Sequence, residues 1–338
     1  MSTQIIQTSS VSQSDHHKLI LSEPTVVSSV WTRANSSSIL EIEKNKIGAV
    51  WKASKVQGES KAFEISISMY EKDWSLPKYL VTSTTELWSP VFAKLPSGEL
   101  GIFYREGNTP RSAKGFLLRS SDNGHSWSKP EALPNGILGP TKSKPLLRSD
   151  NVLLCGSSKE IGEPEKDDPK TLRTELYINE FDGKIWKNHG PLTIPNQPFG
   201  AIEPALFHDK EGNIRLVCRD RAYKLEQMGW IYTSISRDGG VTWDPLQKTT
   251  LPNPDCGIDC LGLGRGKALL FYNDSHTERN ALTMALTVDG GHSWKNILIL
   301  EKDEGQFPSA MLDSKGMVHV TYAKQGNITH RVIDASQL

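Results

Sequence analysis

The sequence predicts an all-β protein, a six-bladed β-propeller whose ring is closed by strands from both ends of the chain. Three observations support this prediction. A turn motif recurs at nearly constant spacing, six hairpins share one pattern, and a spare strand segment lies near the N-terminus.

The recurring turn has the pattern Ser/Thr-x-Asp-x-Gly-x-Ser/Thr-Trp and occurs as SSDNGHSW, SRDGGVTW and TVDGGHSW. Its aspartates are Asp122, Asp238 and Asp289, and a weaker copy, NEFDGKIW, contains Asp182. Successive aspartates are roughly 50 to 60 residues apart, which is the length of a propeller blade of about four short strands. We expect each aspartate to accept hydrogen bonds within its own turn on the outer rim of a blade, with a structural and not a catalytic role.

Six hairpins consist of an apolar strand, a polar turn with Gly or Asn, and a second apolar strand. They span residues 37–54, 89–107, 144–158, 203–221, 261–274 and 308–324. Each is predicted to form the inner strand pair of a blade, and five are followed by an outer pair that ends at or near one of the turns. The sixth follows the last turn, so its outer strands must include the spare segment 18–30, which closes the ring and removes an exposed edge.

Composition narrows the function classes. We expect residues 1–17 to form a disordered tail and residues 18–338 to form one propeller domain. The net charge is zero, with 39 basic and 39 acidic residues, which argues against nucleic acid or a membrane as partner and leaves a small molecule. The first residues lack the features of a secretory signal, so a cytoplasmic location is expected. Histidine spacing indicates no metal site, and no cofactor is expected; the oligomeric state is not predicted.

The recurring turns are Asp-boxes, and the chain resembles the six-bladed sialidase-like propellers of the Asp-box, or BNR, repeat superfamily. The resemblance extends from about Trp31 to Leu338. The segments that carry it are GILGPTKSKP, LCGSS, VCRDR, LPNPDCGID, LLFYN and GMVHVTYAK. It implies the fold, whereas function depends on the site.

Sialidases use a tyrosine nucleophile paired with a glutamate, an aspartic acid, and three arginines that bind the substrate carboxylate. The first hairpin here begins TRANSSSI, which contains Arg33 and Asn35 but no Arg-Ile-Pro motif. The last blade opens with GQFPSA, which has Gln306 at the place of the expected glutamate and no tyrosine before its proline. The resemblance therefore implies a sialidase site that has lost its nucleophile.

Candidate site residues lie mainly where inner strands begin or end. The catalytic candidates are Arg105, Arg219, Tyr272, Glu203 and Asp259. The substrate-binding candidates are Trp31, Asn35, Trp51, Trp88, Tyr104, Lys142, Lys144, Asn273, Gln306, Phe307 and Tyr322. Structural alternatives stay open, because arginines pair with nearby carboxylates, lysines in loops are solvated, and aromatic rings fill cores. A funnel with aromatic walls and few polar groups is typical of a small-molecule site.

Three functions remain open: a sialidase or related glycoside hydrolase, a non-hydrolytic enzyme, and a binding propeller without chemistry. The chain also resembles intracellular fungal propellers with degraded sialidase sites that act as hetero-Diels–Alderases in tropolone sesquiterpenoid pathways. That resemblance implies joining of a tropolone quinone methide to a terpene such as humulene. A cycloaddition needs close approach of its partners and donors to a carbonyl oxygen, which Arg105, Arg219, Lys144, Tyr104 or Tyr272 can supply. Forming the quinone methide by loss of water adds one acid–base group, Glu203 or Asp259.

Overall fold

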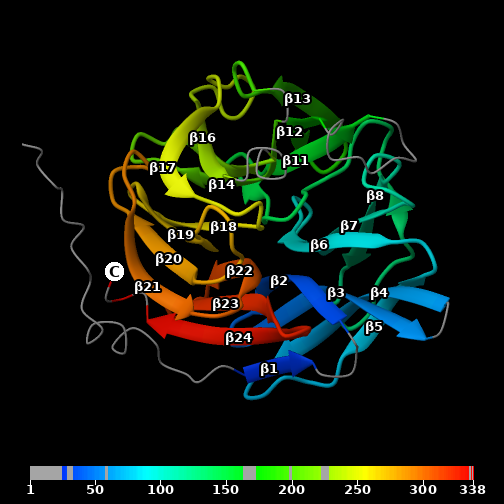
Figure 1. The fold of residues 1–338 in the computed structure, drawn as a ribbon. Coiled ribbons are helices and arrows are strands. Elements are labelled where there is room, and N and C mark those ends of the chain that lie inside the picture. The colour runs from blue at the N-terminus through cyan, green and yellow to red at the C-terminus, as the bar shows by residue number, and fades with distance from the viewer. Residues whose placement is uncertain are drawn as a thin grey trace, which may run out of the picture.

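The computed structural model describes residues 25–28, 33–57, 60–162, 173–197, 200–221, 228–334, 336 and 338. Within these ranges the chain forms 24 strands and no helical element. The strands make six four-stranded antiparallel sheets, and Figure 1 shows them as blades around a central axis. The predicted all-β, six-bladed propeller is confirmed. No helix in the described part of the chain is long and apolar enough to span a membrane.

The strands follow the blades in chain order. Blade 1 consists of β2 (Arg33–Glu43), β3 (Lys46–Gln57), β4 (Ser60–Tyr70) and β5 (Lys78–Ser83). Blade 2 consists of β6 (Leu87–Lys94), β7 (Leu100–Glu106), β8 (Lys114–Ser120) and β9 (Glu131–Ala132). Blade 3 consists of β10 (Leu146–Leu147), β11 (Leu153–Ile161), β12 (Arg173–Phe181) and β13 (Trp186–Leu192). Blade 4 consists of β14 (Ala201–His208), β15 (Ile214–Asp220), β16 (Trp230–Ser236) and β17 (Gln247–Pro252). Blade 5 is β18 (Asp259–Gly264), β19 (Lys267–Asn273), β20 (Leu282–Thr287), β21 (Lys295–Glu301), and blade 6 is β22 (Gln306–Leu312), β23 (Met317–Lys324), β24 (Asn327–Asp334), β1 (Thr25–Ser28).

The six predicted hairpins are the first and second strands of the six blades. Figure 1 shows first strands such as β2, β14 and β22 nearest the axis. Neighbouring blades cover both faces of the inner strand pairs, so nearly every residue of the second strands β7 and β19 is buried. Burial on both faces explains why these segments are continuous apolar runs and do not alternate with polar residues.

The two chain ends meet in blade 6. The N-terminal strand β1 pairs antiparallel with β24, with Thr25 opposite His330. It is the outermost strand of a blade whose other three strands come from the C-terminus. The predicted closure is therefore confirmed, and Thr25–Ser28, the part of the segment 18–30 that the structure describes, forms the strand. The predicted tail, residues 1–17, lies outside the described residues.

Each Asp-box joins the third and fourth strands of its blade, in blades 2, 4 and 5, so the boxes do not end the outer pair as expected. Asp238 accepts hydrogen bonds from the main-chain N–H groups of Val241 and Thr242 and from the Thr242 hydroxyl. The indole of Trp243 donates to the Gly240 carbonyl at 3.0 Å. These contacts hold the turn, as its residue types predict.

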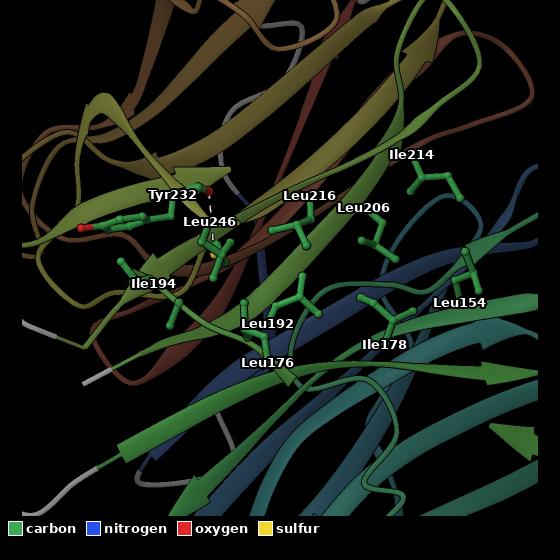
Figure 2. Packing of buried hydrophobic residues seen from close by; sticks show 12 residues of the cluster. Leu154, Leu176, Ile178, Leu192, Ile194, Leu206, Ile214, Leu216, Tyr232 and Leu246 are labelled. Atoms are coloured by element: carbon green, nitrogen blue, oxygen red, sulfur yellow. Dashed lines mark hydrogen bonds between the residues drawn. The ribbon is translucent and has the colours of Figure 1, made fainter. Parts of the chain in front are cut away.

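Packing between blades supplies the core. Figure 2 shows the cluster between blades 3 and 4, in which Leu176 and Ile178 from β12 face Leu206 and Leu216 from β14 and β15. Trp243 of the Asp-box packs against this cluster. The box therefore couples a turn at the rim to the interface between two sheets.

Replacing Asp289 by alanine is expected to lower the free energy of unfolding by about 1–2 kcal/mol. This is the loss seen when a helix N-cap side chain that accepts hydrogen bonds from main-chain N–H groups is removed, and Asp289 has the same role in its turn. Asp289 accepts from the N–H groups of His292 and Ser293 and from the Ser293 hydroxyl. Urea unfolding of the variant and the wild type measures the difference. Asp303→Ala, at an exposed position, is the control and should change stability by less than about 0.5 kcal/mol. Equal losses in both variants would contradict the role of the box.

Candidate functional site

A cavity of about 270 Å³ opens where inner strands begin and second strands end. Its described lining comes from blades 1, 2, 3, 4 and 6. Six predicted residues line it: Asn35, Trp88, Arg105, Glu203, Arg219 and Phe307. In blade 2, Arg105 pairs with Gly115, whereas Ser120 of the Asp-box pairs with Leu100, five residues along the strand. The Asp-boxes thus lie about 17 Å away, toward the opposite face of the ring.

Four blades begin their inner strand with the same irregularity. Each has a β-bulge, in which two residues of the first strand oppose one residue of the second. Within each bulge one residue other than glycine has a positive φ, between 32° and 57°. These residues, here called the bulge corners, are Ser36, Ser89, Glu203 and Phe307, and all four line the cavity. Strained backbone of this kind concentrates at functional sites, so its recurrence around one cavity makes that cavity the candidate site.

Glu203 and Arg219 form a buried ion pair in the cavity, with Arg219 Nε 2.8 Å from Glu203 Oε2. Arg219 also pairs with the buried carboxylate of Asp255. Burial opposes ionisation of Glu203, but the charge and hydrogen bond of Arg219 hold its pKa below the usual value. Burial likewise disfavours the charged form of Arg219, and the two carboxylates hold its pKa above the ordinary range. Both groups are therefore charged at neutral pH, and Glu203 can accept a proton.

Phe307 stands next to this pair. A Cβ atom at Gly257 would lie 2.7 Å from Cδ1 of Phe307 and 3.2 Å from Oε2 of Glu203, so ring and carboxylate flank the same glycine. The guanidinium of Arg279 lies 5.7 Å from the ring centroid of Phe307. The aromatic residue beside the glutamate thus has no hydroxyl, and no tyrosine occurs among the described residues of the cavity wall.

Arg105 is held differently from Arg219. Its Nη1 donates to the Ser158 carbonyl at 2.8 Å, and its Nη2 donates to the Thr141 hydroxyl at 2.7 Å. Its Nε is buried without a hydrogen-bond partner in the described ranges. Burial lowers the pKa of Arg105 to about 10, an effect that Glu160 and Glu203 partly oppose. The side chain therefore remains a cation at neutral pH, and its neighbours leave one donor unused.

Comparison with known proteins identifies the family of this chain. The model of the BNR repeat-like domain family matches residues 45–320. The chain belongs to this family. It is 21% identical over 247 residues to a sialidase of Bacteroides fragilis (strain YCH46), an alignment that covers 67% of this chain and 42% of the relative. The chain thus spans less than half the length of that curated relative.

Solved structures share the fold of this BNR repeat-like propeller. A protein of unknown function from Dyadobacter fermentans DSM 18053 has a TM-score of 0.72 at 16% identity, over 92% of this chain and 98% of that one. The Hadza microbial sialidase Hz136 has a TM-score of 0.70 at 16% identity, over 91% and 67%. Trypanosoma rangeli sialidase in complex with the inhibitor DANA has a TM-score of 0.64 at 14% identity, over 90% and 55%. At these identities the likeness shows the sialidase-like fold alone.

Several predicted site residues of the BNR repeat-like propeller lie in its core and not at the cavity. Trp51, Tyr104, Tyr272 and Tyr322 are almost completely buried between sheets. The Tyr272 hydroxyl donates to Asn296 at 2.8 Å and the Tyr322 hydroxyl to Glu301 at 2.6 Å. These contacts correct the expectation that the four rings wall the funnel or donate to a ligand.

Asn273 and Gln306 also lie off the cavity. Asn273 Nδ2 donates to the carbonyls of Asn280 and Gly305, which fixes a loop of blade 5. Gln306 begins β22, directly before the bulge corner Phe307, and is not part of the cavity wall. Trp31 lies outside the described residues.

Three predicted polar residues connect blades across the axis, namely Lys142, Lys144 and Asp259. Lys142 Nζ donates to the Pro308 carbonyl of blade 6 at 2.6 Å, and burial lowers the pKa of Lys142. Lys144 lies 3.1 Å from Asp259 of blade 5, which also accepts from the Ala310 N–H. None of the three lines the cavity, so the expected pair of Glu203 with Asp259 does not face one ligand.

Sequence reasoning missed other lining residues, chiefly Lys52, Ser89, Glu160 and Arg221. A signal for Ser89 was present, because Ser-Pro, Glu-Pro and Phe-Pro stand at equivalent bulges of blades 2, 4 and 6. Proline within a sheet favours such irregularities. The described residues include no group of three or more side chains suited to hold a metal ion.

Proposed function

We propose that this chain is a non-hydrolytic small-molecule enzyme, a hetero-Diels–Alderase that joins a tropolone quinone methide to a terpene of the humulene type. One observation carries the proposal. The bulge corner beside Glu203 and Arg219 is Phe307, so the described cavity wall offers no phenolic nucleophile at the place where a sialidase needs one. A cycloaddition forms its bonds between the reactants and requires no nucleophile from the protein.

The cavity provides what this reaction requires. Holding two reactants at reacting distance supplies about 7–11 kcal/mol toward the barrier, and Trp88, Ile202 and Phe307 give the cavity apolar wall for them. Negative charge grows on the diene carbonyl oxygen in the transition state, where a preorganised donor is most effective. Arg105, a cation that lines the cavity and contacts a carbonyl and a hydroxyl, is the donor that we assign.

Glu203 is the acid–base group if the quinone methide forms in the site. Its ionised carboxylate takes the proton of the ring hydroxyl while the hydroxymethyl C–O bond breaks, and the proton then passes to the leaving hydroxide. The net change is loss of one water. Asp259 cannot share this step, because its carboxylate is bound by Lys144 and the Ala310 N–H away from the cavity.

The second candidate is an exo-sialidase or related glycoside hydrolase. It is favoured by three arginines, Arg105, Arg219 and Arg221, at one cavity, because arginine is the usual partner of a substrate carboxylate. Family membership is consistent with it as well. The Phe307 ring argues against it, for the reason given above.

One experiment separates the two. The protein is incubated with a fluorogenic sialoside and, in parallel, with a hydroxymethyl tropolone and humulene, and products are followed by fluorescence and by mass spectrometry. We expect adduct formation well above the buffer rate and no sialoside cleavage. Sialoside cleavage that is lost in Glu203→Gln would overturn the proposal in favour of the hydrolase, and absence of both activities would overturn both.

A further inference from the structure

Asp255 lies in the loop between β17 and β18 and organises the basic side chains of the cavity. Its own side chain is 2% exposed, and its φ is 54°. One carboxylate oxygen pairs with Arg219, and the other lies 3.4 Å from Nη1 of Arg221. Both arginines line the cavity.

The main chain of Asp255 adds to this arrangement. Its carbonyl oxygen accepts from Arg219 Nη1 and from Arg279 Nη2, each at 2.7 Å. Arg279 is the residue whose guanidinium faces Phe307. Three arginines from two blades are thus positioned by a single residue that does not itself line the cavity.

The charges of the cavity balance. Of its four basic residues, Lys52 lies 2.6 Å from Glu86, Arg219 is held by Glu203 and Asp255, and Arg221 is shared by Glu160 and Asp255. In the described part of the chain Arg105 is the fourth and contacts no carboxylate. Four cations therefore face four carboxylates, counting Glu86 and Asp255 behind the wall.

This balance acts against an anionic ligand. A carboxylate entering the cavity has to compete for N–H groups that Asp255, Glu160 and Glu203 already occupy. It also meets the field of buried like charges, which is a common means of rejecting a wrong ligand. An uncharged ligand meets neither penalty and can accept from the Arg105 guanidinium, which no carboxylate of the described residues occupies.

We infer that Asp255 is a specificity-determining residue that neutralises Arg219 and Arg221, so that the cavity accepts uncharged reactants and rejects carboxylated sugars. The inference rests on the proposed function, whose reactants are uncharged. It names Asp255 as a positioning residue, since it acts through the two arginines and does not touch the ligand.

The test is a gain of binding in Asp255→Asn. Asparagine has the same shape and tolerates positive φ, so the loop geometry is retained while one negative charge is removed. N-acetylneuraminic acid is titrated by calorimetry into the wild type and the variant at low and high salt. We expect the variant to bind at least about tenfold more tightly, a gain of about 1.4 kcal/mol, and to lose most of that gain at high salt.

Glu160→Gln is the second variant and should change affinity in the same direction, because it releases Arg221 without altering the Asp255 loop. Asp150→Asn is the matched control, since it removes an exposed carboxylate from Arg148, away from the cavity wall, and should change nothing. Tight, salt-sensitive binding by the wild type, or unchanged affinity in both folded variants, would overturn the inference.

The outcome is separable from that of the proposed function, because binding is measured without turnover. A gain in Asp255→Asn in a protein that forms no adduct would support the inference and refute the cycloaddition. Adduct formation by the wild type with no gain in either variant would do the reverse.

Discussion

Arg105→Met is expected to lower kcat for adduct formation by about 100-fold or more, the usual effect of removing a donor that serves a developing oxyanion. Because the donor acts mainly in the transition state, KM should change much less than kcat. Steady-state rates with the hydroxymethyl tropolone and humulene measure both constants.

Arg119→Met is the matched control for that experiment. Arg119 is a β8 residue that pairs with Glu99 and Glu131 away from the cavity, so its loss should leave turnover unchanged. A variant at Arg105 that keeps its kcat and shows only a raised KM would mean that this residue binds substrate and does not stabilise the transition state.

Acid is expected to destabilise the seam at which the ring closes. His319 and His330 lie buried beside each other in blade 6, with His319 Nδ1 3.0 Å from His330 Nε2. The His330 ring also packs edge-to-face against Trp74 of blade 1. Burial, with His319 as a second cause, lowers the pKa of His330 to about 3. Burial also lowers the pKa of His319, although Asp313 opposes the shift.

The direction of the pH effect follows from where the protons bind. In the unfolded chain histidine takes up a proton near pH 6.5, whereas His330 in the folded protein does so only near its lowered pKa. The stabilising contribution is therefore complete above about pH 6.5 and is lost as the pH falls toward 3. One such histidine costs about 1.4 kcal/mol of stability per pH unit, or about 3 kcal/mol between about pH 6.5 and pH 4.5.

Urea unfolding at several pH values measures this loss in the wild type and in His330→Gln. The variant should be less stable near neutrality, because it loses the ring stacking, but its stability should fall less steeply with acid. His208→Gln, at an exposed position, should keep the wild-type slope. Parallel slopes for all three proteins would show that the histidine pair does not control acid unfolding.

The fold was predictable because its signals are local. Turn residues, hairpin patterns and the spacing of Asp122, Asp238 and Asp289 each reflect one blade and repeat around the ring. The side chain that faces the cavity depends instead on strand parity, because successive side chains point to opposite sides. Lys52 lines the cavity while Trp51 is buried in a core, and Arg105 lines it while Tyr104 stacks on Phe116.

Other parts of the site depend on contacts that no local pattern contains. Asp255 lies some 35 residues from its partners Arg219 and Arg221 in the chain and reaches them only when blades 4 and 5 meet. The tie from Lys142 to Pro308 joins blades on opposite sides of the ring. The sequence indicated Lys142, Lys144 and Asp259 as polar candidates. It did not indicate that Lys144 would pair with Asp259 or that Lys142 would bind a main-chain carbonyl.

The bulge corners have a consequence for how the chemistry of such a propeller evolves. Each corner is formed by a strained backbone and not by a glycine, so its side chain is available for function, and serine, glutamate and phenylalanine already occupy equivalent corners. A single codon change at one corner can therefore exchange a hydroxyl, a carboxylate or a ring at the same place over the cavity, while the hairpin behind it keeps its register. New activities can arise on this ring by substitution at a few interchangeable positions, without remodelling of loops.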